Sequence, residues 1–320
     1  MRFGCVVLVG LTVVGGCVES TSRQPPRTVT VARVGRDAEP KTHAPTTLVW
    51  ARDRQGAAWT YRVQPDGTSE TRLEGIHLAA RNGAWTWVTQ TLDVETEPCD
   101  LSLGSRQPAQ AGTATRALLV GPGQKEQVVV DPPLGCDEHC ANELRHDVTP
   151  VASLGPYLFL EESQYTYACG AHGSTGMSFL VWDVEHGRPV DVVAAVPRPA
   201  ELRAEAAKRF AVDEKELGGP FGDGPPAITE VVPVVEGHRL AFEAQLTIDT
   251  CYACSDGAWS SYTRSVRIRT APPALFAPHA ELPAGVAAFL SRHPDLVLGG
   301  WSEAGAPVSE AERGARTEPR

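Results

Sequence analysis

The sequence is poor in long apolar runs, in positive charge and in repeated units. Its apolar run at 3–16 has 14 residues, whereas a helix that crosses a bilayer needs about 20, so no transmembrane helix is predicted. The 29 Lys and Arg are outnumbered by 39 Asp and Glu, which leaves a net charge of −10. An acidic chain lacks the basic surface that nucleic acids require, so we expect no nucleic-acid partner. No unit repeats at a fixed period, which argues against a propeller.

The short apolar run has the layout of an export signal. It follows Arg2 and ends in Val14-Gly15-Gly16-Cys17, which resembles the lipobox of bacterial lipoproteins. The resemblance implies a signal peptide at 1–16, its removal, and acylation of Cys17 with palmitate-type chains that hold the protein at a membrane surface. The alternative is an ordinary signal peptide with a chance cysteine. Val18 stands where aspartate would signal inner-membrane retention, so we expect a cell-envelope protein at the outer rather than the inner membrane.

Composition divides the remaining chain into a tether, a folded part and a tail. Residues 17–45 have little apolar periodicity and predict a lipidated, flexible tether, and 301–320 predicts a disordered tail. Alternating apolar residues among 30 Gly and 26 Pro predict an antiparallel β region at 46–156. An α+β region packed with it is expected at 157–300. The predicted fold class is therefore α+β, predominantly antiparallel β with one or two short helices.

Two segments carry helix signals. The stronger, 199–210, has Pro199 at its start, strong helix formers along its length and a Gly pair beyond its end. The other, 283–293, places apolar side chains on one face. A strand at 84–89 would put two tryptophans on the same face of a sheet, as core or as a binding surface.

Six cysteines remain beyond the signal and the lipobox. An even number in an exported chain predicts disulfides, although six cysteines allow 15 connectivities. We favour Cys251 with Cys254, Cys136 with Cys140, and Cys99 with Cys169. Two alternatives remain, since the 136/140 and 251/254 spacings also suit tetrahedral zinc, and Cys-Tyr-Ala-Cys could form a redox pair. Oxidising surroundings favour disulfides, so we expect no metal and no cofactor.

The segment 157–270 follows the order of a known envelope domain. It runs through Tyr-Ala-Cys-Gly-Ala-His-Gly at 167–173, a strand, an Asp-x-x-x-Gly turn at 183–187, a helix and a late hairpin. This order resembles the DUF3298 type of sensor domain, found in lysozyme-sensing anti-sigma factors and beside some peptidoglycan deacetylases. Cys169 replaces the usual first glycine, and the Cys-x-x-Cys of the late hairpin is not expected there. The resemblance implies an α+β domain that binds another macromolecule and does not catalyse a reaction.

His172, in a glycine-rich turn, is the weak catalytic candidate of the chain. As a base it would need a carboxylate, and Asp183 or Glu162 is nearest in sequence. His172, Trp259 and Tyr262 are also candidates for a binding face. The leading hypothesis is a lipid-anchored, non-enzymatic envelope module that binds a protein or peptidoglycan partner. The alternative is an envelope hydrolase or zinc-dependent enzyme that uses His172 and nearby carboxylates.

Overall fold

The structure, a computed structural model, describes the folded part of the chain. The described ranges are 46–100, 106–132, 141–170, 172–217, 221–236 and 239–303. All of them fall within one compact unit, residues 43–320. The predicted signal peptide, the tether with Cys17 and most of the predicted tail lie outside these ranges. None of the helices within them has the length and apolarity needed to cross a bilayer.

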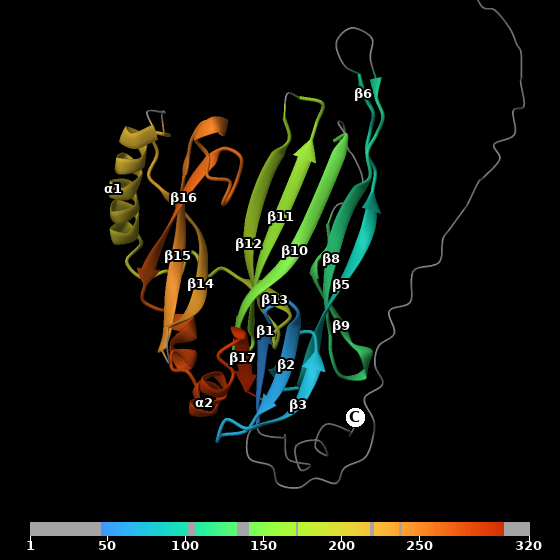
Figure 1. The fold of residues 1–320 in the computed structure, drawn as a ribbon, viewed down its shortest axis with the longest axis vertical. Helices are drawn as coiled ribbons and strands as arrows, with labels where there is room; N and C mark the ends of the chain where they lie inside the picture. Colours follow the sequence, from blue (N-terminus) through green and yellow to red (C-terminus); the bar gives the residue numbers. More distant parts are fainter. Residues whose placement is uncertain are drawn as a thin grey trace, which may run out of the picture. The chain divides into compact units, whose positions relative to one another are not determined.

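Antiparallel strands dominate the described residues and helices are few, which confirms the predicted α+β class. Most strands form one large sheet (Figure 1). Its main path runs, in spatial order, through β13 (Arg188–Val190), β12 (Ser174–Asp183), β11 (Tyr157–Tyr167), β10 (Glu143–Leu154), β17 (Val297–Glu303), β1 (Thr47–Arg52), β2 (Ala58–Val63) and β3 (Ser69–Glu74). A branch adds β8 (Gly112–Val120), β5 (Gly83–Val94), β4 (His77–Ala80) and β9 (Glu126–Val130). A separate two-stranded ladder joins β6 (Cys99–Asp100) to β7 (Arg106–Gln107).

Strand β10 is the point at which the large sheet branches. Near its start it pairs in parallel with β8, where Arg145 lies opposite Thr113. At its end it pairs in parallel with β17, where Ser153 lies opposite Gly300. Along its whole length it pairs antiparallel with β11. One strand therefore belongs to both branches of the sheet.

The junction of β1, β10 and β17 is closely packed. The buried Trp50 indole Nε1 donates to Ser153 Oγ at 2.8 Å. A Cβ atom at Gly299 would overlap the Trp50 ring, and one at Gly300 would overlap Ser153. The two glycines therefore allow the last strand to approach the centre of the sheet.

A second sheet and a helix form further layers. The three-stranded sheet has the order β14 (Ala227–Glu236), β15 (Arg239–Asp249), β16 (Thr263–Thr270). Helix α1 (Pro199–Leu217) packs on this sheet, on the side away from the large sheet (Figure 1). Its buried residues Leu202, Ala206 and Phe210 recur every four positions, so they form one stripe along the helix. The predicted helix at 199–210 is confirmed and extends by two further turns.

The two faces of the large sheet bury separate cores. One core lies between the large sheet, the three-stranded sheet and the helices, and it includes Phe159, Phe242 and Phe276. Helix α2 (Ala284–Arg292), close to the predicted 283–293, contributes Val286 and Phe289 to this core. The other core contains Trp50, Trp85, Leu119, Leu158 and Trp182, with Trp87 packed against it. The tryptophans of β5 therefore serve as core residues.

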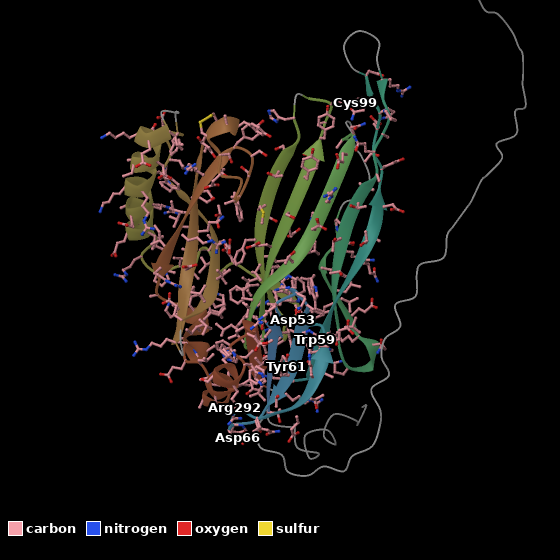
Figure 2. The ribbon with its side chains drawn as sticks, viewed as in Figure 1. Asp53, Trp59, Tyr61, Asp66, Cys99 and Arg292 are labelled. Carbon is pink, nitrogen blue, oxygen red and sulfur yellow. A yellow bond between two sulfur atoms is a disulfide. The ribbon has the colours of Figure 1, made fainter. Side chains whose placement is uncertain are left out.

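Two turns in the N-terminal hairpins are held by aspartates. In the turn between β2 and β3, Asp66 Oδ1 accepts from Thr68 N at 2.9 Å, and Gly67 has φ +82°. Arg292 at the end of α2 donates to Asp66 O (Figure 2). In the preceding turn, Asp53 Oδ2 accepts from Trp59 Nε1 at 2.9 Å, and this bond lowers the pKa of Asp53.

Two predicted boundaries differ from the structure. Strand β17 extends to Glu303, with Trp301 and Ser302 buried, so the predicted tail at 301–320 begins too early. The cause is the bulk of Trp301, which packs in the core despite its polar neighbours. The predicted division at residue 156 lies in the turn between β10 and β11, which are adjacent strands of the same sheet. The regions 46–156 and 157–300 thus share the large sheet.

Strand β10 falls within the predicted antiparallel β region at 46–156, but no individual strand was predicted there, although β10 holds a central position in the large sheet.

Candidate functional site

Four of the six predicted disulfide cysteines are paired as expected. Cys99 bonds Cys169, 70 residues later, and Cys251 bonds Cys254. Cys99 is fully buried, and Figure 2 labels it at β6. Cys136 and Cys140, the third predicted pair, lie outside the described residues. Because Cys251 and Cys254 are oxidised, they are not available as the zinc thiolates of the alternative reading.

The segment between β15 and β16 is a compact loop closed by the Cys251–Cys254 disulfide. A short 3-10 helix, η2 (Tyr252–Cys254), lies within it. Ser255 Oγ lies 2.7 Å from Ser260 O and 2.8 Å from Thr263 O. Arg264 donates to Cys254 O and forms an ion pair with Asp213 of α1. The loop therefore has a fixed conformation before any ligand is present.

The same loop is attached to the start of β12. Ser261 N donates to Thr175 O at 3.0 Å, and Thr175 N donates to Ser261 Oγ at 2.8 Å. Gly176 and Ser260 form an isolated antiparallel bridge. These bonds bring the end of the three-stranded sheet to the segment that precedes β12, which contains His172.

Three exposed rings meet at this junction. The rings of His172 and Tyr252 stack with centroids 3.7 Å apart and an interplanar angle of 21°. Tyr262 packs against Tyr252 at 5.8 Å and lies 6.4 Å from His172. Tyr252 is 45% exposed and Tyr262 is 47% exposed. We call His172, Tyr252 and Tyr262 the aromatic patch.

The structure brings two of the three predicted binding residues together and places Tyr252 beside them. His172 and Tyr262 come together although they are far apart in sequence. Trp259 lies in the loop before β16, which begins only at Thr263, and it is partly buried. Tyr252 was missed, although its place inside Cys-x-x-Cys, where a disulfide exposes the intervening side chains, was an available signal.

The carboxylates expected to assist His172 have other roles. Asp183 ends β12, whereas His172 precedes its first residue, so the strand's ten residues separate them by roughly 30 Å. Glu162 Oε2 lies 3.2 Å from His146 Nε2. His172 Nδ1 contacts the carbonyl oxygen of Gly173 at 3.1 Å. His172 therefore lacks both of the acid–base partners that the hydrolase alternative assigned to it.

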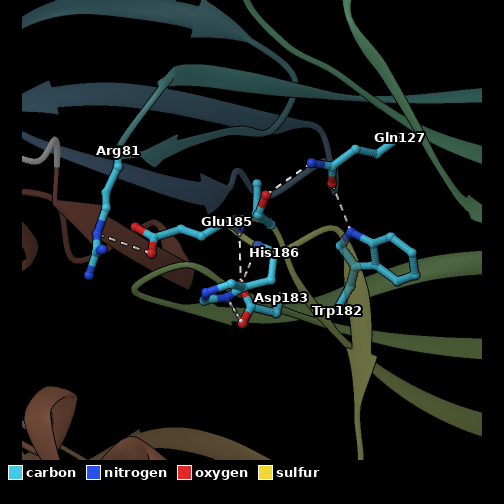
Figure 3. A network of polar contacts seen from close by, with 7 residues as sticks. Arg81, Gln127, Trp182, Asp183, Glu185 and His186 are labelled. Carbon is cyan, nitrogen blue, oxygen red and sulfur yellow. Dashed lines mark hydrogen bonds and ion pairs between the residues drawn. The ribbon is translucent and has the colours of Figure 1, made fainter. Parts of the chain in front are cut away.

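Asp183 stabilises the turn that follows β12 (Figure 3). Its Oδ1 accepts from the backbone N–H groups of Glu185 and His186, and its Oδ2 lies 2.6 Å from His186 Nδ1. Gly187 completes the turn with φ +63°. Beside it, the Gln127 side chain accepts from Trp182 Nε1 and donates to Val184 O, joining β9 to β12. The Asp-x-x-x-Gly motif at 183–187 is thus a structural turn.

Glu161 and Glu162 point to opposite faces of β11, as alternation along a strand requires. Glu162 and His146 border a polar cavity of about 370 Å³ on the face away from the three-stranded sheet. Its lining is mostly hydroxyl and amide groups, among them Gln164 and Ser178. Glu161 faces Glu230 of β14 instead.

Comparisons with known proteins find a distant structural neighbour. No family model matches the chain, and no curated protein matches it. A solved structure, a DUF3298 family protein from Pseudomonas aeruginosa PAO1, covers 62% of this chain and 95% of its own length. Its sequence identity is 16% and its TM-score is 0.30.

Proposed function

We propose that the chain is a lipid-anchored, non-enzymatic protein of the cell envelope that binds a protein partner through the aromatic patch. The observation that carries the proposal is the geometry of this patch. Segments next to two different sheets contribute its exposed rings, and a disulfide and the bonds between Thr175 and Ser261 hold these segments together.

Exposed tyrosines on a rigid loop suit protein recognition. Tyrosine gives a large contact area for the loss of few side-chain rotations and is enriched among the residues that dominate interface energies. A loop already held in one conformation loses little further entropy on binding. His172, stacked on Tyr252, adds a polar edge to the same surface.

The N-terminal sequence supports the location. The lipobox 14–17 and the tether 17–45 would hold the folded part near, but not against, a membrane. Val18 favours the outer membrane. An anchored module with a preformed recognition surface is suited to capture partners that diffuse along the envelope.

The test is site-specific photo-crosslinking in cells that express the full chain. We expect Tyr262→p-benzoylphenylalanine to give a discrete protein adduct. The same replacement at Val212, which is 56% exposed on α1, should not give this adduct. His172→Ala and Tyr252→Ala should each weaken it about tenfold or more, as expected for residues at the centre of an interface.

Three results would contradict the proposal. Adducts of the same sizes from positions 212 and 262, or none from 262, would remove the patch as a specific interface. Co-sedimentation of the protein with purified sacculi, lost on Tyr252→Ala and Tyr262→Ala, would replace the protein partner with peptidoglycan.

A further inference from the structure

A second candidate site lies between the two sheets and shares no residue with the aromatic patch. It is a cavity of about 600 Å³, within the range of roughly 300–1,000 Å³ that is usual for small-molecule sites. Strands β10, β11 and β17 border it on one side, and β14 and the segment after α2 border it on the other. Most of its lining is apolar, and its principal apolar members are Val151, Val232, Leu240, Leu296, Leu298 and Trp301.

Three charged side chains interrupt this apolar lining. Glu230 of β14 has a side chain that is only 3% exposed. Arg267 of β16 contacts both of its carboxylate oxygens, at 3.4 and 3.2 Å. Glu161 of β11, in the large sheet, lines the same cavity, and its carboxyl group raises the pKa of Glu230. The cavity is therefore lined by two carboxyl groups and one guanidinium, and the guanidinium is paired with Glu230.

The neighbouring groups do not supply the missing positive charge. Gln245 lies between Glu230 and Arg267 in the register of the sheet, is 2% exposed, and has a buried Nε2 without a partner. Arg269, one row along, pairs with Glu236 and Glu243. His293 also lines the cavity. The row formed by Glu230, Gln245 and Arg267 is thus polar throughout, and with Glu161 the cavity has one more carboxyl group than guanidinium groups.

The titration of Glu230 agrees with this charge count. Burial raises the pKa of Glu230 to about 7, against the opposing effect of Arg267, and Glu161 raises it further. Near neutral pH, a proton held by Glu161 and Glu230 therefore neutralises the excess negative charge that no protein cation neutralises. A buried carboxyl group with a shifted pKa in a cavity is a common mark of a binding or catalytic site.

We infer that this cavity binds an amphipathic primary amine, with the ammonium group between Glu161 and Glu230 and the apolar body against Val232, Leu298 and Trp301. A charged amine would satisfy both carboxylates through charge-assisted hydrogen bonds. An amphipathic acid of the same size would place a third carboxylate beside the pair. A neutral alcohol would leave the excess negative charge uncompensated.

The experiment measures the binding of three six-carbon probes to the full mature protein in lipid nanodiscs by calorimetry, with empty nanodiscs subtracted. The probes are hexylamine, hexanol and hexanoate at pH 7. We expect hexylamine to bind at least about tenfold more tightly than the other two, as one charge-assisted bond predicts. Binding should also release protons, so its heat should change between buffers of different ionisation enthalpy.

Matched variants locate the site. Glu230→Gln should weaken hexylamine binding about tenfold or more and abolish the dependence on buffer. Glu161→Gln, on β11 of the large sheet, provides a second variant if Glu230→Gln lowers stability. Glu236→Gln, on the same strand as Glu230 but outside the cavity, should have no effect. Equal affinity for hexylamine and hexanol, or unchanged binding in both cavity variants, would overturn the inference.

Discussion

Thr175 and Ser261 are joined by hydrogen bonds in both directions, although 86 residues separate them in sequence. Ser261 Oγ accepts from the Thr175 N–H, and the Ser261 N–H donates to the Thr175 carbonyl group. This pair joins the disulfide loop to the large sheet and so determines where Tyr252 and Tyr262 lie relative to His172.

Ser261→Ala should destabilise the protein by about 1 to 3 kcal/mol, because the part-buried Thr175 N–H loses its acceptor. The matched control is Ser265→Ala, since the buried Oγ of Ser265 has no hydrogen-bond partner. Its removal should change the free energy of unfolding little. Urea unfolding of the two variants measures the difference, and equal losses would contradict the role given to Ser261.

The two disulfides among the described residues should differ in their contribution to stability. Cys99–Cys169 closes a loop of 70 residues, whereas Cys251–Cys254 spans three. By the entropy that each removes from the unfolded chain, replacing the first pair by alanine should cost about 4 kcal/mol and the second about 1.5 kcal/mol. Urea unfolding of the two double variants tests the order. Loss of the Cys251–Cys254 disulfide should mainly weaken the photo-crosslink at position 262.

The pH dependence of stability should carry the signature of Glu230. Its pKa is raised from 4.5 to about 7 in the folded chain. The folded state therefore binds more protons than the unfolded state between these values, and stability falls as pH rises through this window, by up to about 3 kcal/mol. Burial lowers the pKa of His279, which adds a slope of opposite sign near its own titration.

The effect of Glu230 is therefore measured as the difference in the free energy of unfolding between the parent protein and Glu230→Gln. Urea unfolding of the parent and of Glu230→Gln at intervals from pH 4.5 to 8 should show a free-energy gap that changes across the window. A gap that stays constant with pH would show that Glu230 ionises in the folded chain as it does in the unfolded chain.

Lipidation depends on one cysteine of the N-terminal segment in our proposal. Cys17→Ala should abolish incorporation of labelled palmitate in cells, whereas Cys5→Ala, in the same apolar run, should not. Val18→Asp should keep the labelled protein and move it to the inner-membrane fraction of a sucrose gradient. Label that persists in Cys17→Ala would mean that the lipobox resemblance is coincidental.

Local patterns predicted the parts of the fold that local physics determines. Helix α1 has Pro199 at its start and buries residues at a regular spacing of four. Strand β10 was missed because polar side chains such as His146 and Asp147 lie on both faces of its first half, and Pro150 interrupts the pattern. Its position in the sheet comes from partners at both ends of the chain.

The site was only partly predictable for the same reason. His172 and Tyr262 could be selected individually, but their contact depends on long-range bonds that no local pattern encodes. Glu230 stands in an apolar strand between Ile228 and Val232, an irregularity that the sequence analysis passed over. Its partner Glu161 lies on another sheet, so the acidic pair exists only in the folded chain.

The pairing of β1 with β17 has a consequence for how the protein forms. The first and last strands of the described chain are neighbours, and β17 alone joins β1 to β10 along the main path of the sheet. Contacts so distant in sequence are slow to form because a long loop must close first. A chain that is still emerging from a ribosome or crossing a membrane cannot complete this sheet. Its N-terminal hairpins must wait, with an open edge, for residues 297–303 to arrive.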